Sequence, residues 1–244
     1  ILAVKNRDIR LAMSTSVNSE SKILTNRNII KRAKAVLPNL IYDENPYTVV
    51  DDGKIYWVLD GYTVSDKYPY STYTEIEYNG QKRDINYIRN SIKVIINSYT
   101  GEMKYYITDR TDPIAMAYRK VYPELFQDLD SEISKTIQDQ FIYPEFLYNV
   151  QSTMLEEYHN TKADVLYRSD NTWEKATYKN QSTNNKTKNT LKPYYTMVSN
   201  SDGEETIGLI QIYTPKNKQN ISSYLIGTVE NGQNKLTLKT LHSD

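Results

Sequence analysis

The sequence predicts an α+β protein in which an antiparallel sheet, built from hairpins, packs against amphipathic helices. Two observations predict this class. Between the hairpins, apolar residues recur at helical spacing in segments with recognisable start and stop signals. Five glycines follow Asp, Asn or Thr near runs of β-branched and aromatic residues, as tight hairpins require. These glycines are Gly53, Gly80, Gly101, Gly203 and Gly232.

The first predicted helix covers residues 25–37. Thr25 is the expected N-cap, apolar residues recur every three or four positions after it, and the stretch stops before Pro38. Its other face is basic, which is typical of a face exposed to solvent.

Two hairpins are expected within residues 47–107. The first joins residues 47–50 to 55–59, and the second joins 92–96 to 103–107. Helix 25–37 followed by these hairpins predicts a curved antiparallel sheet wrapped on one helix.

Helices are next expected within residues 113–158. Asp112 and Pro113 form an N-cap and first-turn pair, and the helix that follows should end at Pro123. A longer helix is predicted from Glu145 to Tyr158, with one apolar face over about four turns. With the first helix and the hairpins, these elements complete an α+β body over residues 1–178.

The segment 179–192 contains one apolar residue and no periodicity. It cannot bury enough surface to offset its ordering entropy, so we expect a mobile polar loop. The tail, residues 193–244, is predicted as strand, turn, strand, helix and hairpin, packed on the same body. Thr214 and Pro215 are the expected start of the tail helix, and Gly227 is its expected end.

Composition excludes several classes of function. The 30 basic residues balance the 30 acidic ones, so no electrostatic attraction favours nucleic acid as a partner. Cysteine is absent, which removes disulfides and thiolate chemistry, and with two histidines we predict no metal site and no cofactor. No apolar run reaches the roughly 18 residues of a membrane helix. Because the chain starts at Ile1 rather than Met, we expect a piece of a longer protein.

Between about Thr25 and Gly227, several motifs resemble those of uncharacterised protein family 0182 and occur in the same order along the chain. The motifs are TNRNI at 25–29, YWVLDGYT at 56–63, SDKYPYS at 65–71, YIRNSIK at 87–93, DPI at 112–114, YPE at 143–145 and YTP at 213–215. The members are large bacterial and archaeal membrane proteins with several N-terminal transmembrane helices and a long soluble C-terminal region. The family has no assigned activity.

The resemblance implies a place at the cell membrane, with this fragment on the extracytoplasmic side. The expected partner is the protein's own membrane-spanning region, with other envelope components or a second copy of the chain as alternatives. A non-catalytic interaction or assembly module is the function this favours.

The run 56–73 combines aspartates with tyrosines, and it carries the candidate ligand-binding residues. Carboxylates among aromatic faces can bind sugars or cationic groups. The alternative is that the two aspartates serve local backbone amides in a turn. The candidates are Asp60, Tyr62, Asp66, Tyr68 and Tyr70.

No catalytic residue is predicted. Paired carboxylates would suit a glycan hydrolase, and three pairs are close in sequence, but spacing along the chain does not fix their separation. Serine-nucleophile and phosphate-loop motifs are missing. His159 is expected at the C-terminal end of its helix, where the helix dipole favours a partly protonated imidazole. A glycan-binding or glycan-hydrolysing domain built on residues 56–73 therefore stays as the alternative. The carboxylate pairs are Asp60 with Asp66, Asp109 with Asp112, and Glu156 with Glu157.

Overall fold

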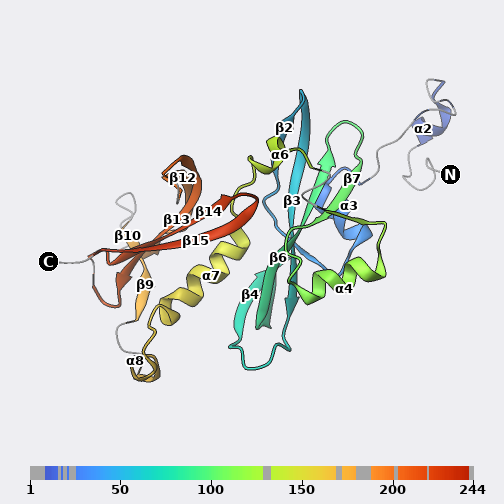
Figure 1. Ribbon diagram of the computed structural model, residues 1–244. Helices are drawn as coiled ribbons and strands as arrows, with labels where there is room; N and C mark the ends of the chain where they lie inside the picture. Colours follow the sequence, from blue (N-terminus) through green and yellow to red (C-terminus); the bar gives the residue numbers. More distant parts are fainter. Residues whose placement is uncertain are drawn as a thin grey trace.

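The computed structural model describes residues 9–15, 18, 21, 26–128, 133–168, 172–179, 188–200, 203–218 and 220–241 (Figure 1). More of them lie in strands than in helices, and nearly all strand pairs are antiparallel, so the predicted α+β class is confirmed.

The first sheet has six strands, in the order β1-β3-β6-β7-β8 with β2 also paired to β3. Among the described strands of this sheet, only the β7 and β8 pair is parallel. Both predicted hairpins are confirmed, because β2 pairs with β3 and β6 pairs with β7. The strands are β1 Ile41–Tyr42, β2 Tyr47–Asp51, β3 Lys54–Ser65, β6 Tyr87–Asn97, β7 Met103–Ile107 and β8 Phe126–Asp128.

A separate hairpin connects β3 to β6. It consists of β4 (Thr74–Tyr78) and β5 (Gln81–Ile85). Asn79 and Gly80 both have positive φ at its tip, as the Asn-Gly pair predicted.

One face of the six-stranded sheet is covered by α3 (Ile29–Val36) and α4 (Pro113–Val121). The first helix is shorter than predicted, because the side chain of Asn28 accepts a hydrogen bond from the Lys31 amide and so caps it. Thr25 lies outside the described residues. The second helix begins after Asp112, as predicted.

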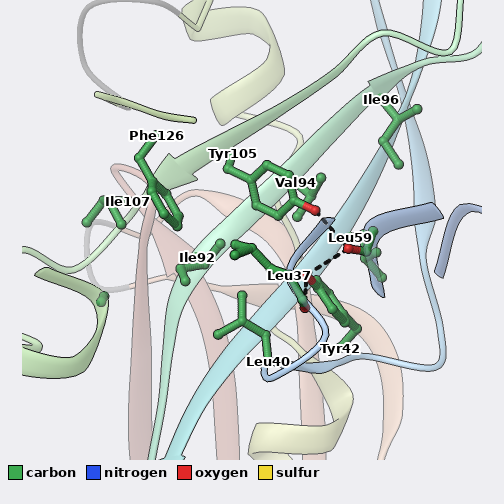
Figure 2. Close-up of a cluster of buried hydrophobic side chains, with 12 residues drawn as sticks. Leu37, Leu40, Tyr42, Leu59, Ile92, Val94, Ile96, Tyr105, Ile107 and Phe126 are labelled. Carbon is green, nitrogen blue, oxygen red and sulfur yellow. Dashed lines mark hydrogen bonds between the residues drawn. The ribbon is translucent and has the colours of Figure 1, made fainter. Parts of the chain in front are cut away.

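The core beneath these helices contains tyrosines whose hydroxyl groups reach helix carbonyls (Figure 2). The hydroxyl of Tyr105 donates to the carbonyl of Ala33 at 3.0 Å, and that of Tyr42 donates to Leu37 at 3.0 Å. Buried phenols thereby satisfy carbonyls at the end of α3.

The predicted helix α7 (Glu145–Tyr158) is confirmed, and it lies between the two large sheets (Figure 1). It contacts β4 and β6 on one side and β13 and β9 on the other. Short helices that the pattern did not predict also occur: α2 (Ile9–Met13), α6 (Lys135–Gln138) and α8 (Ala163–Arg168).

The second sheet has five strands, in the order β12-β13-β14-β15 with β9 also paired to β13. The tail helix predicted after Pro215 is wrong, because Ser223–Glu230 forms the central strand β14, hydrogen-bonded to a neighbour on each side. The remaining strands are β9 Trp173–Lys175, β12 Tyr194–Ser199, β13 Glu205–Pro215 and β15 Gln233–Thr240.

The predicted loop 179–192 is wrong at its edges. Lys179 ends β10 (Thr177–Lys179), which pairs with β11 (Lys188–Thr190). Residues 180–187 lie outside the described part of the chain. Among the described residues, no helix has the length and apolarity that a membrane crossing requires.

Candidate binding site

A β-bulge in β6 lies at the candidate site and changes the direction of two side chains. Gly61 pairs with Ile92 and Thr63 pairs with Arg89, so the two β6 residues between them oppose a single residue of β3. Those two residues, Asn90 and Ser91, send their side chains to different partners. Bulges re-aim side chains in this way and are frequent beside functional sites.

The side chain of Asn90 joins a buried ion pair. Lys93 Nζ lies 2.5 Å from Asp60 Oδ1, and the two side chains are 2% and 4% exposed. Asn90 Nδ2 donates to the same oxygen at 3.0 Å. The ammonium group also lies 4.7 Å from the centroid of the Phe141 ring. Asp60 is therefore held by an ammonium and an amide inside the sheet.

This polar chain continues into the second sheet. Asn234, at the start of β15, donates from Nδ2 to Asn90 Oδ1 at 3.2 Å. The turn before β15, at Asn231 and Gly232, therefore approaches β6 where the bulge lies.

A pocket of about 330 Å³ opens at this junction. Strand β6, the segment that follows β7, helix α7 and the β14–β15 turn all contribute to its wall. Most of the lining side chains are amides or members of ion pairs. The lining residues are Ile88, Arg89, Asn90, Lys93, Thr108, Asp109, Leu147, Gln151, Gly232, Gln233 and Asn234.

Arg89 forms the outer wall of the pocket. Its Nη1 donates to Asp109 Oδ2 at 2.9 Å and to Thr111 Oγ1 at 2.7 Å. Burial alone would raise the pKa of Asp109, but hydrogen bonds from Thr111 and the charge of Arg89 outweigh it and hold that pKa below its usual range. The guanidinium lies 5.7 Å from the centroid of Tyr87, whose ring stacks on Tyr68 at 5.3 Å.

Ser91, the other bulge residue, binds Asp112 on the opposite side of the sheet. The carboxylate of Asp112 accepts hydrogen bonds from the hydroxyls of Ser91, Thr63 and Tyr87, and from the amide of Ile114. Burial, together with this neighbouring carboxylate, raises the pKa of Tyr87. The carboxylate that caps α4 is thus also the centre of a hydroxyl cluster.

A third buried carboxylate belongs to Asp43. Its Oδ2 accepts from the Tyr62 hydroxyl at 2.6 Å and from the amide of Phe146 at 3.3 Å, while Oδ1 accepts from the amide of Asn45 at 2.9 Å. Burial raises the pKa of Asp43, and the hydrogen bonds of Tyr62 and Asn45 oppose that rise.

The structure separates the five candidate residues predicted from the sequence. Asp60 and Tyr62 are buried in β3. Asp66, Tyr68 and Tyr70 lie after the strand and are exposed, with Tyr68 anchored by Asn86 through two hydrogen bonds to its backbone. The candidates therefore form a buried pair and an exposed group of three. Ligand binding by these residues stays a prediction.

Glu156, from the predicted pair with Glu157, has a cationic partner. Glu156 lies 3.8 Å from the ammonium of Lys175. Burial raises the pKa of Glu156, and Lys175 opposes that rise. His159 is the C-cap of α7, as predicted, and stacks on Trp173 with ring centroids 3.7 Å apart. Within the described residues no group of three or more acidic or histidine side chains is arranged to hold a metal ion.

Sequence reasoning missed Lys93, Asn90 and Asn234 as site residues. Lys93 offered a signal, because it interrupts the apolar run 92–96 within β6, and a lysine buried there requires a partner. Asn234 offered none, since only the packing of the two sheets brings it to Asn90.

The fold and the pocket define a class of protein: an α+β protein with two antiparallel sheets and a polar pocket at their junction. The chain belongs to the uncharacterised protein family UPF0182, whose family model matches residues 1–244.

Relatives in this family come from several bacteria. A UPF0182 protein of Clostridium acetobutylicum is 39% identical over 246 residues, which covers 100% of this chain and 26% of the relative. Those of Desulfitobacterium hafniense and Caldicellulosiruptor saccharolyticus are 38% and 40% identical, covering 90% and 86% of this chain and 22% of each relative. The chain thus spans about a quarter of the length of these curated relatives. No solved structure matches it.

Proposed function

We propose that this chain is a non-catalytic binding or assembly module, held on the extracytoplasmic side of the cell membrane by the membrane-spanning region of a longer protein. The non-catalytic role is supported by one observation: the buried carboxylates are already hydrogen-bonded within the fold. Asp60, Asp112 and Asp43 each accept hydrogen bonds from several groups of the fold itself. A carboxylate used for acid or base catalysis must instead reach a substrate.

The partners that this proposal names are the protein's own membrane-spanning region, other envelope components or a second copy of the chain. Two features support an extracytoplasmic binding role. The resemblance of the motifs to a family expected to consist of membrane proteins supports the location, and the polar pocket at the sheet junction supports binding.

The location is tested by labelling cysteine variants of the full-length protein in intact cells. This chain contains no cysteine, and Tyr70 is fully exposed. Tyr70→Cys should react with a membrane-impermeant maleimide, read by mass spectrometry of the peptide that contains residue 70. Ser152→Cys is the matched control, because Ser152 is fully buried and should react only after denaturation. Labelling of Tyr70→Cys only after cell lysis would contradict the proposed side of the membrane.

The non-catalytic role is tested by incubating the purified full-length protein with peptidoglycan. We expect no release of soluble fragments. The alternative expected from the sequence, a glycan-binding or glycan-hydrolysing domain built on residues 56–73, makes a different prediction. Release that Asp66→Ala abolishes without lowering the melting temperature would replace the proposed role with a hydrolytic one.

A further inference from the structure

We propose that the pocket at the junction of β6, α7 and the β14–β15 turn binds a small neutral polyhydroxylated ligand, such as the terminal sugar residue of a glycan. The proposal rests on the binding role proposed above and names the ligand class. It moves the binding site from the run 56–73 to a pocket whose polar groups come from both sheets.

The size of the pocket suits such a ligand. Its volume of about 330 Å³ lies at the lower end of the roughly 300–1,000 Å³ typical of small-molecule sites. Apolar floor is supplied by Ile88 and Leu147, both from the core that also contains residues of the second sheet.

Charge pairing in the wall favours a neutral ligand. The guanidinium of Arg89 is paired with Asp109, and the ammonium of Lys93 is paired with Asp60. The lining itself contains two cations and one carboxylate, and Asp60, which lies outside the lining, supplies the second negative charge. An anion would have to compete with the carboxylates already bound to both cations.

The remaining polar groups match hydroxyl groups. Side-chain amides offer both donors and acceptors, and a sugar hydroxyl also donates and accepts. The amide of Gln151 is oriented by Tyr143, whose hydroxyl donates to Gln151 Oε1 at 2.7 Å, so its NH₂ group is a donor for the pocket. Four amides and one hydroxyl line the wall, from Asn90, Gln151, Gln233, Asn234 and Thr108. The Asn90 amide is already bonded to Asp60 and Asn234, and the Thr108 hydroxyl donates to the Asn90 carbonyl, so Gln151 and Gln233 are the main groups for a ligand.

The experiment measures saccharide binding by the full-length protein in lipid nanodiscs, using saturation-transfer NMR and calorimetry. The probes are glucose, N-acetylglucosamine and maltose, with glucuronate and inorganic phosphate as charged comparators. We expect at least one neutral probe to bind more tightly than either charged probe. In Gln151→Ala/Gln233→Ala, its Kd should rise by at least about tenfold, because both ligand hydrogen bonds are lost.

The chain offers a matched control at its other Asn-Gly-Gln turn. Gln81 follows Asn79 and Gly80 as Gln233 follows Asn231 and Gly232, and it is exposed and does not line the pocket. Gln81→Ala should leave the Kd unchanged. Asn234→Ala is an independent second variant if the double variant folds poorly, and it should also weaken binding.

Three results would overturn the proposal: binding of the charged probes alone, no binding of any neutral probe, or equal binding by the variants and the unaltered protein. These outcomes are separate from those of the labelling and peptidoglycan tests. If the pocket proposal fails, the location and the non-catalytic role are unaffected. If the labelling or peptidoglycan test fails, the saccharide-binding test still decides the pocket proposal.

Discussion

Lys93 and Asp60 form an ion pair inside the six-stranded sheet, with 2.5 Å between Nζ and Oδ1. They occupy facing positions on β6 and β3, so the backbone register itself brings them together. Removing both charges from water is costly, and the pair is tolerated because each ion neutralises the other.

Lys93→Met should strongly destabilise the chain, because it leaves Asp60 buried without its cation. We expect the free energy of unfolding to fall by about 3–5 kcal/mol. Urea denaturation of the 244-residue chain, followed by tryptophan fluorescence, measures this change. Trp57 lies in the first sheet and Trp173 in the second, so both sheets contribute to the signal.

The matched control for Lys93→Met replaces both charges. Lys93→Met/Asp60→Leu should recover most of the lost stability, because an apolar pair can substitute for a buried ion pair. If the double variant is as unstable as the single one, shape rather than uncompensated charge accounts for the loss.

Asp112→Ala should also destabilise the protein, through a different mechanism. It removes the cap of α4 and leaves the hydroxyls of Thr63 and Ser91 without their shared acceptor. The expected loss is about 2–5 kcal/mol, combining the cap and the unsatisfied hydroxyls. Asp66→Ala, at an exposed aspartate, is the control and should change stability by less than about 0.5 kcal/mol. Equal effects of the two substitutions would contradict the cluster's role.

Much of the fold follows from local signals. Asp112 and Pro113 mark the start of α4, and Asn79 and Gly80 form the tip of the β4–β5 hairpin, because capping and positive φ depend on the residues themselves. Thr214 and Pro215 carry a similar helix-start signal and are misleading. The segment after them forms β14, whose hydrogen bonds to β13 and β15 override the local preference.

The site was less predictable than the fold. The residues that meet at the pocket come from β6, α7 and the β14–β15 turn, and the link from Asn90 to Asn234 spans 144 positions. The two bulge residues, Asn90 and Ser91, carry no marker of their own, and Gly61 on the facing strand β3 is the one local sign of the bulge. The aspartate and tyrosine pattern identified Asp60 as unusual, but its partner Lys93 lies 33 positions away and is set by strand register.

Asp43 and Asp109 should contribute to stability with opposite pH dependence. Burial raises the folded-state pKa of Asp43, whereas hydrogen bonds from Thr111 and the charge of Arg89 lower that of Asp109. The contribution of Asp43 is fully present below the unfolded pKa of about 3.9 and is lost as pH rises through its higher folded pKa. That of Asp109 is present above the unfolded pKa and is lost as pH falls through its lower folded pKa.

The pH prediction is tested with Asp43→Asn and Asp109→Asn, each compared with the unaltered chain across acidic pH. The unfolding free energy of the unaltered chain minus that of Asp43→Asn should decrease as pH rises. The same difference for Asp109→Asn should increase. Parallel slopes for the two variants would show that the two environments do not differ as described.

Gly227→Ala should destabilise the packing of α7 on the second sheet. A Cβ at this position would lie 2.8 Å from Cδ2 of Tyr148 and 3.0 Å from Cδ2 of Tyr143, closer than side-chain carbons approach. Both rings are buried, and the Tyr148 hydroxyl also donates to the carbonyl of Leu225 at 2.7 Å, so that ring cannot withdraw without losing a buried hydrogen bond. The expected cost is about 1–3 kcal/mol in urea denaturation.

The source of that cost is identified by a double-mutant cycle with Tyr148→Leu. Leucine is shorter than tyrosine, so in that background the methyl group added at position 227 should meet less resistance, and Gly227→Ala should cost less than it does beside Tyr148. A loss that arose from backbone conformation would be the same in both backgrounds. Because Gly227 lacks the positive φ seen at the hairpin glycines, the close approach of the ring is the physical reason that this position has no side chain.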